Sequence, residues 1–252
     1  ISHIENATME DVRAFFKKYY CPSNAILCIA GNFELDFIKE RVNYWFSDIA
    51  SGIKPARIIA SEPKQIEFRE LELERNVPAS AFYYAFKMAE RKHPDYYIAD
   101  ILSDSLSREK SSLLYLKLKK EKPFVSEIVA YITGSIDEGL FILSGKLNDG
   151  ISFEDFDNAL WEVLNEVCLN PIEEKELNSL KIKMQTARAF QEQGILNRSM
   201  NLCYFQLLGD ANGINEEHLI YEQISCDHIQ SYANELFQKT NCSLLKIKAQ
   251  QA

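Results

Sequence analysis

The sequence contains no long apolar run, no excess of basic residues and no glycine-rich phosphate loop. No segment approaches the roughly 18 consecutive apolar residues that indicate a membrane-spanning helix, so we expect none. The formal net charge is -9, whereas a nucleic-acid binder needs a basic surface, so we expect no nucleic-acid partner. The glycines occur singly, and neither Gly-x-x-x-x-Gly-Lys nor Gly-x-Gly-x-x-Gly is present. These absences exclude the common nucleotide-binding loops.

The usual sequence signatures of hydrolases are also missing. There is no Gly-x-Ser-x-Gly nucleophile elbow. A zinc peptidase helix needs two histidines on one face beside a glutamate, and the nearest segment, Ile214–His218, has isoleucine where the first ligand must be. We interpret His228 as part of a helix start and His93 as a helix entry. We therefore predict no catalytic residue, no metal ligand and no cofactor in this chain.

The six cysteines include no Cys-x-x-Cys pair. We interpret them as structural thiols, because free cysteines commonly behave as small buried hydrophobes, and this interpretation favours a reducing compartment. A cytoplasmic location is therefore favoured, with the periplasm as the alternative. The chain begins at Ile1 with neither Met nor a signal segment, from which we expect a cut or processed product.

The first 50 residues have the pattern of a helix, a strand and a second helix. Residues 8–20 form an amphipathic helix capped by Thr8, residues 25–30 a strand buried on both faces, and residues 34–46 the second helix. The inward residues of the second helix would be Ile38, Val42, Trp45 and Phe46. Two prolines and the loss of any clean period over 51–65 then indicate a linker.

The remainder of the chain is predicted to be an α+β domain, with an antiparallel or mixed sheet covered by helices on one face. Strands are predicted at 66–68, 71–74, 79–88, 125–133, 138–147 and 242–248. Helices are predicted at 94–106, 109–121, 153–169, 172–190, 194–208 and 226–238. A change of phase after residue 68 predicts a β-bulge, and the aromatic-rich segment 79–88 predicts a central strand.

The first and last helix–strand segments repeat each other without a gap at an offset of 217 residues. Thr8 matches Ser225 as a helix cap, and Asn24 matches Asn241 in the turn before each strand. The apolar positions coincide in the pairs Val12/Ile229, Phe15/Tyr232, Tyr19/Leu236, Tyr20/Phe237 and Leu27/Leu244. Cap, stripe, turn and strand in one register indicate a duplication.

This duplication predicts how the chain is divided into domains. Residues 1–50 are the closing piece of a preceding homologous domain, of which most lies outside this sequence. Residues 51–65 are the linker, and residues 66–252 are a complete second domain.

The segment Thr8–Asn32 resembles the end of the first domain of the pitrilysin/insulinase zinc peptidases, which include the mitochondrial processing peptidase. The shared features are an acidic-capped helix, Phe-x-x-x-Tyr-Tyr, a Pro-x-Asn-Ala turn, an apolar strand and a closing Gly-Asn. The similarity extends over essentially the whole chain and covers the segment usually called the inactive domain. It implies the LuxS/metallohydrolase-like fold of the processing peptidases.

In that family a His-x-x-Glu-His helix in the first domain binds zinc, and its glutamate activates water. The resemblance therefore implies a zinc ion upstream of this chain. Many members also carry an Arg and a Tyr in the second domain that bind substrate, and the matching positions here are Lys119 and Ser126, with Pro123 in place of a glycine. Lysine lacks the planar fork of arginine, so this pair is a degenerate substrate-binding candidate. The alternative is that 109–121 is only a charged, packed helix.

The resemblance implies a chain that does no catalysis by itself. We expect the substrate-binding, chamber-forming half of a zinc-dependent metalloendopeptidase. A structural or assembly subunit, that is a pseudo-peptidase scaffold, is the alternative, and an unrelated hydrolase using a residue such as His218 is a third hypothesis. The expected partners are the upstream peptidase domain, another family chain in a homo- or hetero-oligomer, and a peptide substrate.

Overall fold

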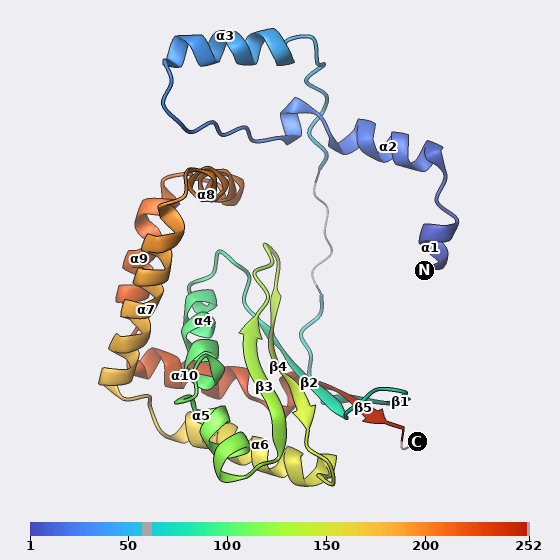
Figure 1. Cartoon of the computed structure of the whole chain (residues 1–252), viewed down its shortest axis with the longest axis vertical. Helices are drawn as coiled ribbons and strands as arrows, with labels where there is room; N and C mark the ends of the chain where they lie inside the picture. The colour runs from blue at the N-terminus through green and yellow to red at the C-terminus, as the bar shows by residue number, and fades with distance from the viewer. Residues whose placement is uncertain (57–61, 251–252) are drawn as a thin grey trace. The chain divides into compact units, whose positions relative to one another are not determined.

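The computed structural model describes residues 1–56 and 62–250, and its central feature is a five-stranded mixed sheet (Figure 1). Across the sheet the strands lie in the order β1 (Arg69–Arg75), β5 (Cys242–Ala249), β2 (Ala81–Met88), β4 (Gly139–Leu147) and β3 (Val125–Ile132). Only β1 and β5 run parallel; the other neighbours are antiparallel. The predicted α+β class with a mixed sheet is confirmed.

The helices fall into two compact units of the chain. The first unit comprises Ile1–Glu62 with Ala189–Asn215, and the second comprises Pro63–Arg188 with Glu216–Ala252. Helices before the linker are α1 (Ser2–Glu5), α2 (Met9–Tyr19), the short η1 (Pro22–Asn24) and α3 (Leu35–Phe46). Later helices are α4 (Pro94–Ser107), α5 (Leu113–Tyr115), the π-helical turn η2 (Leu116–Glu121), α6 (Phe153–Leu169), α7 (Glu174–Glu192), α8 (Ile195–Leu208), α9 (Gly213–Glu222), α10 (Cys226–Leu236) and η3 (Lys239–Asn241).

The hydrophobic core lies in the second unit, where α4, α6 and α10 pack on one face of the sheet. Alternation along β2 buries Phe82, Tyr84 and Phe86 completely, because every second side chain of a strand points to the same face. The ring of Phe82 lies 4.2 Å from that of Phe156 on α6, and the ring of Phe86 lies 5.2 Å from that of Phe237 after α10. The prediction of a central, aromatic strand is confirmed.

Two predicted elements near the linker differ in the structure. Residues 66–68 form no strand. The side chain of Gln65, and not a backbone ladder, connects this segment to β5: Gln65 Nε2 donates to the carbonyl of Cys242 (2.8 Å), and Ser243 Oγ donates to Gln65 Oε1 (3.1 Å). Gln65 is buried, so the last residue of the predicted linker belongs structurally to the sheet. Linker residues 57–61 lie outside the described residues.

Two helical regions were also predicted incompletely. The helix predicted at 109–121 begins only at Leu113 and continues as the π-helical turn η2. Helix α9 was missed: it begins at a glycine and has little amphipathic pattern, so no start signal marked it.

The repeat detected in the sequence recurs in local geometry. Helices α2 and α10 have matching bounds, 9–19 and 226–236, and each begins with a reciprocal capping box. The turns η1 and η3 also match, and in each the asparagine side chain donates back to the helix end: Asn24 Nδ2 to the carbonyl of Tyr19 (2.9 Å), and Asn241 Nδ2 to that of Leu236 (3.1 Å). The two segments therefore fold alike as far as the turn.

The two copies differ in how far their helices are buried and in the segment that follows the turn. The apolar stripe of α10 is buried, whereas Phe15 on α2 is 57% exposed. Residues 25–30 were predicted as a strand buried on both faces, and this is wrong: they form no strand and are largely exposed. A strand exists through its pairing, and no described strand pairs with this segment. On α3, Trp45 and Phe46 were predicted to point inward but are exposed for the same lack of a covering surface.

Within residues 1–56 and 62–250, no helix combines the length and apolarity needed to cross a membrane.

Candidate functional site

The structure brings Lys119 and Ser126 together, with the Lys119 side chain covering the outer edge of β3 at Ser126. Buried Leu118 and Val125 anchor η2 and β3 on either side of a tight turn, in which the N–H of Phe124 donates to the carbonyl of Leu118 (3.1 Å). The Lys119 ammonium then donates to the carbonyl of Ser126. Ser126 sits at a bulge in β3, where the pairing with β4 shifts register.

A second side chain covers the same edge of β3 four residues further along the strand, at Ala130. Ser107, the last residue of α4, donates its hydroxyl to the carbonyl of Ala130 (3.1 Å) and accepts from the N–H of Ala130 (2.6 Å). The outer edge of β3 is therefore satisfied at two places by side chains of its own domain. The Ser126 hydroxyl is also engaged within the sheet, since it donates to the carbonyl of Lys146 (3.4 Å).

The opposite edge of the sheet, β1, is open. Among the described strands β1 pairs only with β5, and all of the β1 side chains except that of Leu73 are exposed. Its sequence, Arg-Glu-Leu-Glu-Leu-Glu-Arg, alternates, so glutamates line one face and Leu71 and Leu73 the other. An open edge offers a row of backbone N–H and C=O groups to a partner strand.

A groove of about 820 Å³ adjoins this open edge. It lies between β1, β5 and the start of α6, with lining side chains that include Glu72, Glu74, Lys246, Lys248 and Phe153. Lys246 Nζ pairs with Glu70 (2.8 Å) and Lys248 Nζ with Glu72 (2.6 Å), and the hydrogen bond that Lys248 donates to Glu72 raises the pKa of Lys248. The groove is thus polar, with charges of both signs, and it can take side chains of an added strand.

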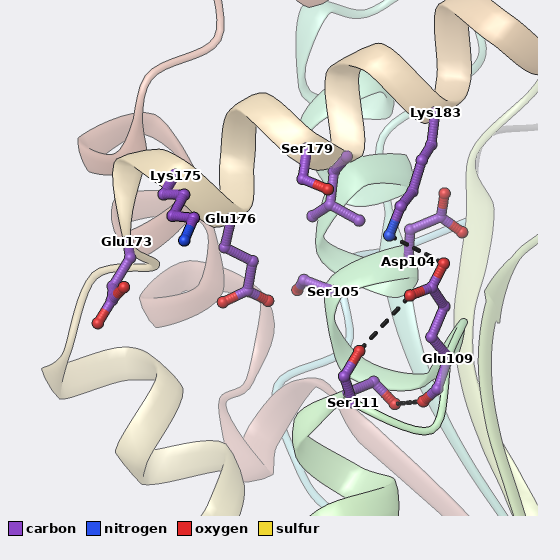
Figure 2. A pocket seen from close by; sticks show the side chains of 11 residues that line it. Asp104, Ser105, Glu109, Ser111, Glu173, Lys175, Glu176, Ser179 and Lys183 are labelled. Atoms are coloured by element: carbon purple, nitrogen blue, oxygen red, sulfur yellow. Dashed lines mark hydrogen bonds and ion pairs between the residues drawn. The ribbon is translucent and has the colours of Figure 1, made fainter.

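A smaller cavity of about 330 Å³ lies between α4, the following loop and the start of α7 (Figure 2). Lys183 and Glu109 face each other on one side of it and form an ion pair of 2.8 Å, which lowers the pKa of Glu109. On the other side burial raises the pKa of Glu176, and neighbouring Glu173 adds to this. Neither Lys119 nor Ser126 lines this cavity. Lys183 and Glu109 neutralise each other, so this ion pair leaves no uncompensated charge to bind a ligand.

A buried polar network joins the end of β2 to α4 and α9. Arg91 forms an ion pair with Glu217 and donates to the hydroxyl of Tyr97 (2.8 Å). Close by, the hydroxyl of Tyr221 donates to Asp100 (2.7 Å), and burial raises the pKa of Asp100. Sequence analysis missed this network because its partners lie far apart in the chain, with Arg91 and Glu217 separated by 126 positions.

The histidines and acidic residues do not fit a zinc site. No group of three or more His, Cys, Asp or Glu side chains suited to a metal occurs in the part of the chain that the structure describes. Ile214 is a buried hydrophobe, and Glu217 is held by Arg91 rather than placed beside His218 as a base. His93 Nδ1 accepts from the N–H of Asp95 (3.2 Å) at the start of α4. His228 completes the capping box of α10, so both helix-start predictions are confirmed.

Comparisons with known proteins identify the family of this chain and two of its relatives. A family model described as the peptidase M16 inactive domain matches residues 6–184. Zinc protease PqqE of Helicobacter pylori is 23% identical over 248 residues, which are 97% of this chain and 56% of that protein. The uncharacterized zinc protease YmxG of Bacillus subtilis is 21% identical over 229 residues, 90% of this chain and 55% of that protein. The chain therefore spans about half the length of these curated relatives.

Solved structures show the same fold. The crystal structure of a protease from Helicobacter pylori matches with a TM-score of 0.88 and 22% identity, covering 97% of this chain and 60% of that one. The peptidase M16 inactive domain from Pseudomonas fluorescens matches with a TM-score of 0.81 and 15% identity, covering 98% of this chain and 58% of that one. The resemblance to the pitrilysin/insulinase peptidases is confirmed, and this chain belongs to the family of the peptidase M16 inactive domain.

Proposed function

We propose that this chain is the peptide-binding, non-catalytic half of a zinc-dependent metalloendopeptidase. The observation that carries the proposal is the open edge of β1 beside a polar groove, in a domain whose described residues do not fit a zinc site. Its curated relatives are named zinc proteases. In this proposal the catalytic zinc and its ligands belong to a domain outside this chain.

An extended peptide would add to β1 as a further strand. Backbone hydrogen bonds give such a complex its affinity, and alternate side chains reach opposite faces of the sheet. One set of peptide side chains would enter the groove beside Glu72 and Lys248, and the other set would lie over Leu71 and Leu73. Binding through the backbone suits a peptidase that accepts unstructured chains of varied sequence.

The first unit supports a role in enclosing that peptide. The exposed stripe of α2 matches, position by position, the stripe that α10 buries in its own domain. We therefore propose that residues 1–50 complete a preceding homologous domain, connected through 51–65 to the second domain at 66–252. In that domain residues 25–32 would occupy the place that β5 occupies here, between a parallel and an antiparallel neighbour. The two domains would form one side of a chamber, closed by a second family chain.

A binding experiment on the chain tests the proposal. A fluorescently labelled, unstructured peptide is titrated while hydrogen exchange is followed along β1 and β3. We expect slowed exchange in β1, and weaker binding for Leu71→Ala than for the control Leu140→Ala, a similar exposed leucine in another strand. Slowed exchange in β3, or equal affinity for both variants, would overturn the assignment to β1.

The hypothesis that Lys119 and Ser126 bind substrate stays a prediction and has its own test. If the Lys119 ammonium holds the peptide, Lys119→Ala weakens binding about three- to tenfold, as expected for one exposed hydrogen bond of about 1 kcal/mol. Lys120→Ala, an exposed lysine on the same turn, is the matched control. If Lys119 only covers the edge of β3, both variants bind alike and Lys119→Ala speeds exchange in β3.

A scaffold subunit is the second candidate, and one observation favours it. Lys119 and Ser126 are both engaged within their own domain, as expected where substrate contacts have been lost. This candidate predicts a full-length protein that lacks an intact His-x-x-Glu-His motif and binds no peptide. Chelator-sensitive cleavage of a peptide by this chain alone would contradict both candidates.

A further inference from the structure

Two cysteines from distant parts of the chain meet in the first unit. Cys28 lies in the exposed extended segment after η1, and Cys203 lies on α8. The side chain and backbone of Cys28 lie within interaction range of the Cys203 thiol. Cys203 Sγ in addition lies 3.9 Å from the carbonyl of Ile26. The Cys203 sulfur therefore rests against the segment 26–28, with the Cys28 sulfur as its neighbour.

We propose that Cys28 and Cys203 form a reversible disulfide that fastens the N-terminal segment to α8. Both thiols are partly exposed, so a small oxidant can reach them. Since the sulfurs are already neighbours, forming a bond of about 2.0 Å needs a local approach rather than a change of fold. The other four cysteines are placed differently: Cys21 contacts Ser23, Cys168 donates to the carbonyl of Ala233, and Cys242 is buried.

The repeat is compatible with this pairing. At the offset of 217 residues, Leu27 matches Leu244, which is buried in the core, and Cys28 matches Leu245, which lies on the other face of the sheet. If residues 25–32 pair as a strand in a preceding domain, Leu27 points into that domain and Cys28 points away from it. The thiol then stays available to α8, so the disulfide is compatible with the proposed domain organisation without depending on it.

The chemistry is two thiol–disulfide exchanges with a low-molecular-weight disulfide such as glutathione disulfide. The thiolate of one cysteine attacks the reagent, forms a mixed disulfide and releases one glutathione thiolate. The second cysteine then attacks the protein sulfur of the mixed disulfide and releases the second glutathione. The protein loses two electrons and two protons, and the reagent becomes two thiols. Desolvation and the neighbouring Cys28 raise the pKa of the Cys203 thiol, so the exchange should speed up as the pH rises above neutral.

The test uses the full 252-residue chain in buffers of stepped oxidised-to-reduced glutathione ratio, quenched by acid and alkylation. We expect a monomer that has lost two hydrogen atoms in mass, a proteolytic fragment pair joined through Cys28 and Cys203, and a higher melting temperature than the reduced chain. Cys28→Ser should abolish the link and trap Cys203 as a mixed disulfide with glutathione. Cys226→Ser, a partly exposed cysteine without a thiol contact, is the matched control and should form the link normally.

Three outcomes would overturn the proposal. They are two separate glutathione adducts on Cys28 and Cys203 with no joined fragments, links spread over the other cysteines, and a link that survives Cys28→Ser. Circular dichroism of each variant shows that the serine substitutions leave the fold intact, so a lost link reports the missing thiol.

Discussion

Replacing Glu217 by alanine tests whether the Glu217-His218 segment is structural or a remnant of a metal site. In the structure Glu217 neutralises Arg91, whose side chain is only 7% exposed, while Glu217 itself is 17% exposed. Removing one partner of a buried ion pair costs about 3–5 kcal/mol, because the other charge stays buried without compensation. We expect a large loss of stability from Glu217→Ala and no effect of zinc.

The magnitude is reduced by the other contacts of the arginine. Its guanidinium also donates to Tyr97 (2.8 Å) and lies 4.4 Å from the ring centroid of Tyr96, and these contacts remain in the variant. The carboxylate is also partly exposed, so the expected cost is about 2–3 kcal/mol, below the range for fully buried pairs. Glu217→Gln keeps a hydrogen-bond acceptor for the arginine and should lose less.

Urea unfolding followed by circular dichroism measures these differences. Glu235→Ala, which removes an exposed glutamate from α10, is the control and should change the free energy of unfolding by less than about 0.5 kcal/mol. Combining Glu217→Ala with Arg91→Met should recover part of the loss, because the double variant has no stranded charge. A loss below about 1 kcal/mol for Glu217→Ala, or zinc stabilising the wild type but not the variant, would refute the ion-pair interpretation.

Two further substitutions test the core and the buried network. Gly145→Ala should destabilise the second unit by more than about 2 kcal/mol in urea unfolding, because the added Cβ would lie 2.1 Å from the carbonyl oxygen of Glu127 and 2.6 Å from the ring of Phe82; wild-type stability would contradict the close packing of β3 on β4. Asp100→Asn should stabilise the protein at neutral pH, because burial raises the folded-state pKa of Asp100 and its charged form is therefore disfavoured. A raised folded pKa means that the native state binds the proton more tightly, so this group lowers stability as the pH rises through the window between its unfolded and folded pKa values. The advantage of the variant should shrink as unfolding is measured at progressively more acidic pH, and an advantage independent of pH would contradict it.

The sequence predicted most of the elements whose signal is local. The aromatic-rich strand predicted at 79–88 and the helix caps at Thr8 and Ser225 each depend on residues a few positions apart, and the structure has a strand at Ala81–Met88 and both caps. The strand predicted at 25–30 failed because its signal was only composition, whereas a strand needs a neighbour to receive its hydrogen bonds.

The functional features were less accessible because they depend on contacts between distant residues. Lys119 and Ser126 were singled out only through a family resemblance, and no local pattern could show that Lys119 bonds the backbone of Ser126 at a sheet edge. The ion pair of Arg91 and Glu217 also has no local signal. In the sequence alone, Glu217 is only part of the incomplete metal-binding motif at Ile214–His218. The pairing of Cys28 with Cys203 likewise has no signal in residue spacing.

Helices α2 and α10 share one sequence pattern but differ in burial, because their surroundings differ. Both have the same cap, length and turn, yet Tyr232 is buried and its counterpart Phe15 is exposed. Because the stripes match residue by residue, the proposed preceding domain would cover α2 with a strand and helices arranged as β2, α4 and α6 are around α10. In that proposed domain the same register would turn Leu27 towards the covering surface and Cys28 away from it, so one strand could complete a preceding sheet and still be joined to α8. The two proposals therefore require the same orientation of residues 25–32, and a measurement that places Cys28 inside a sheet core would remove both.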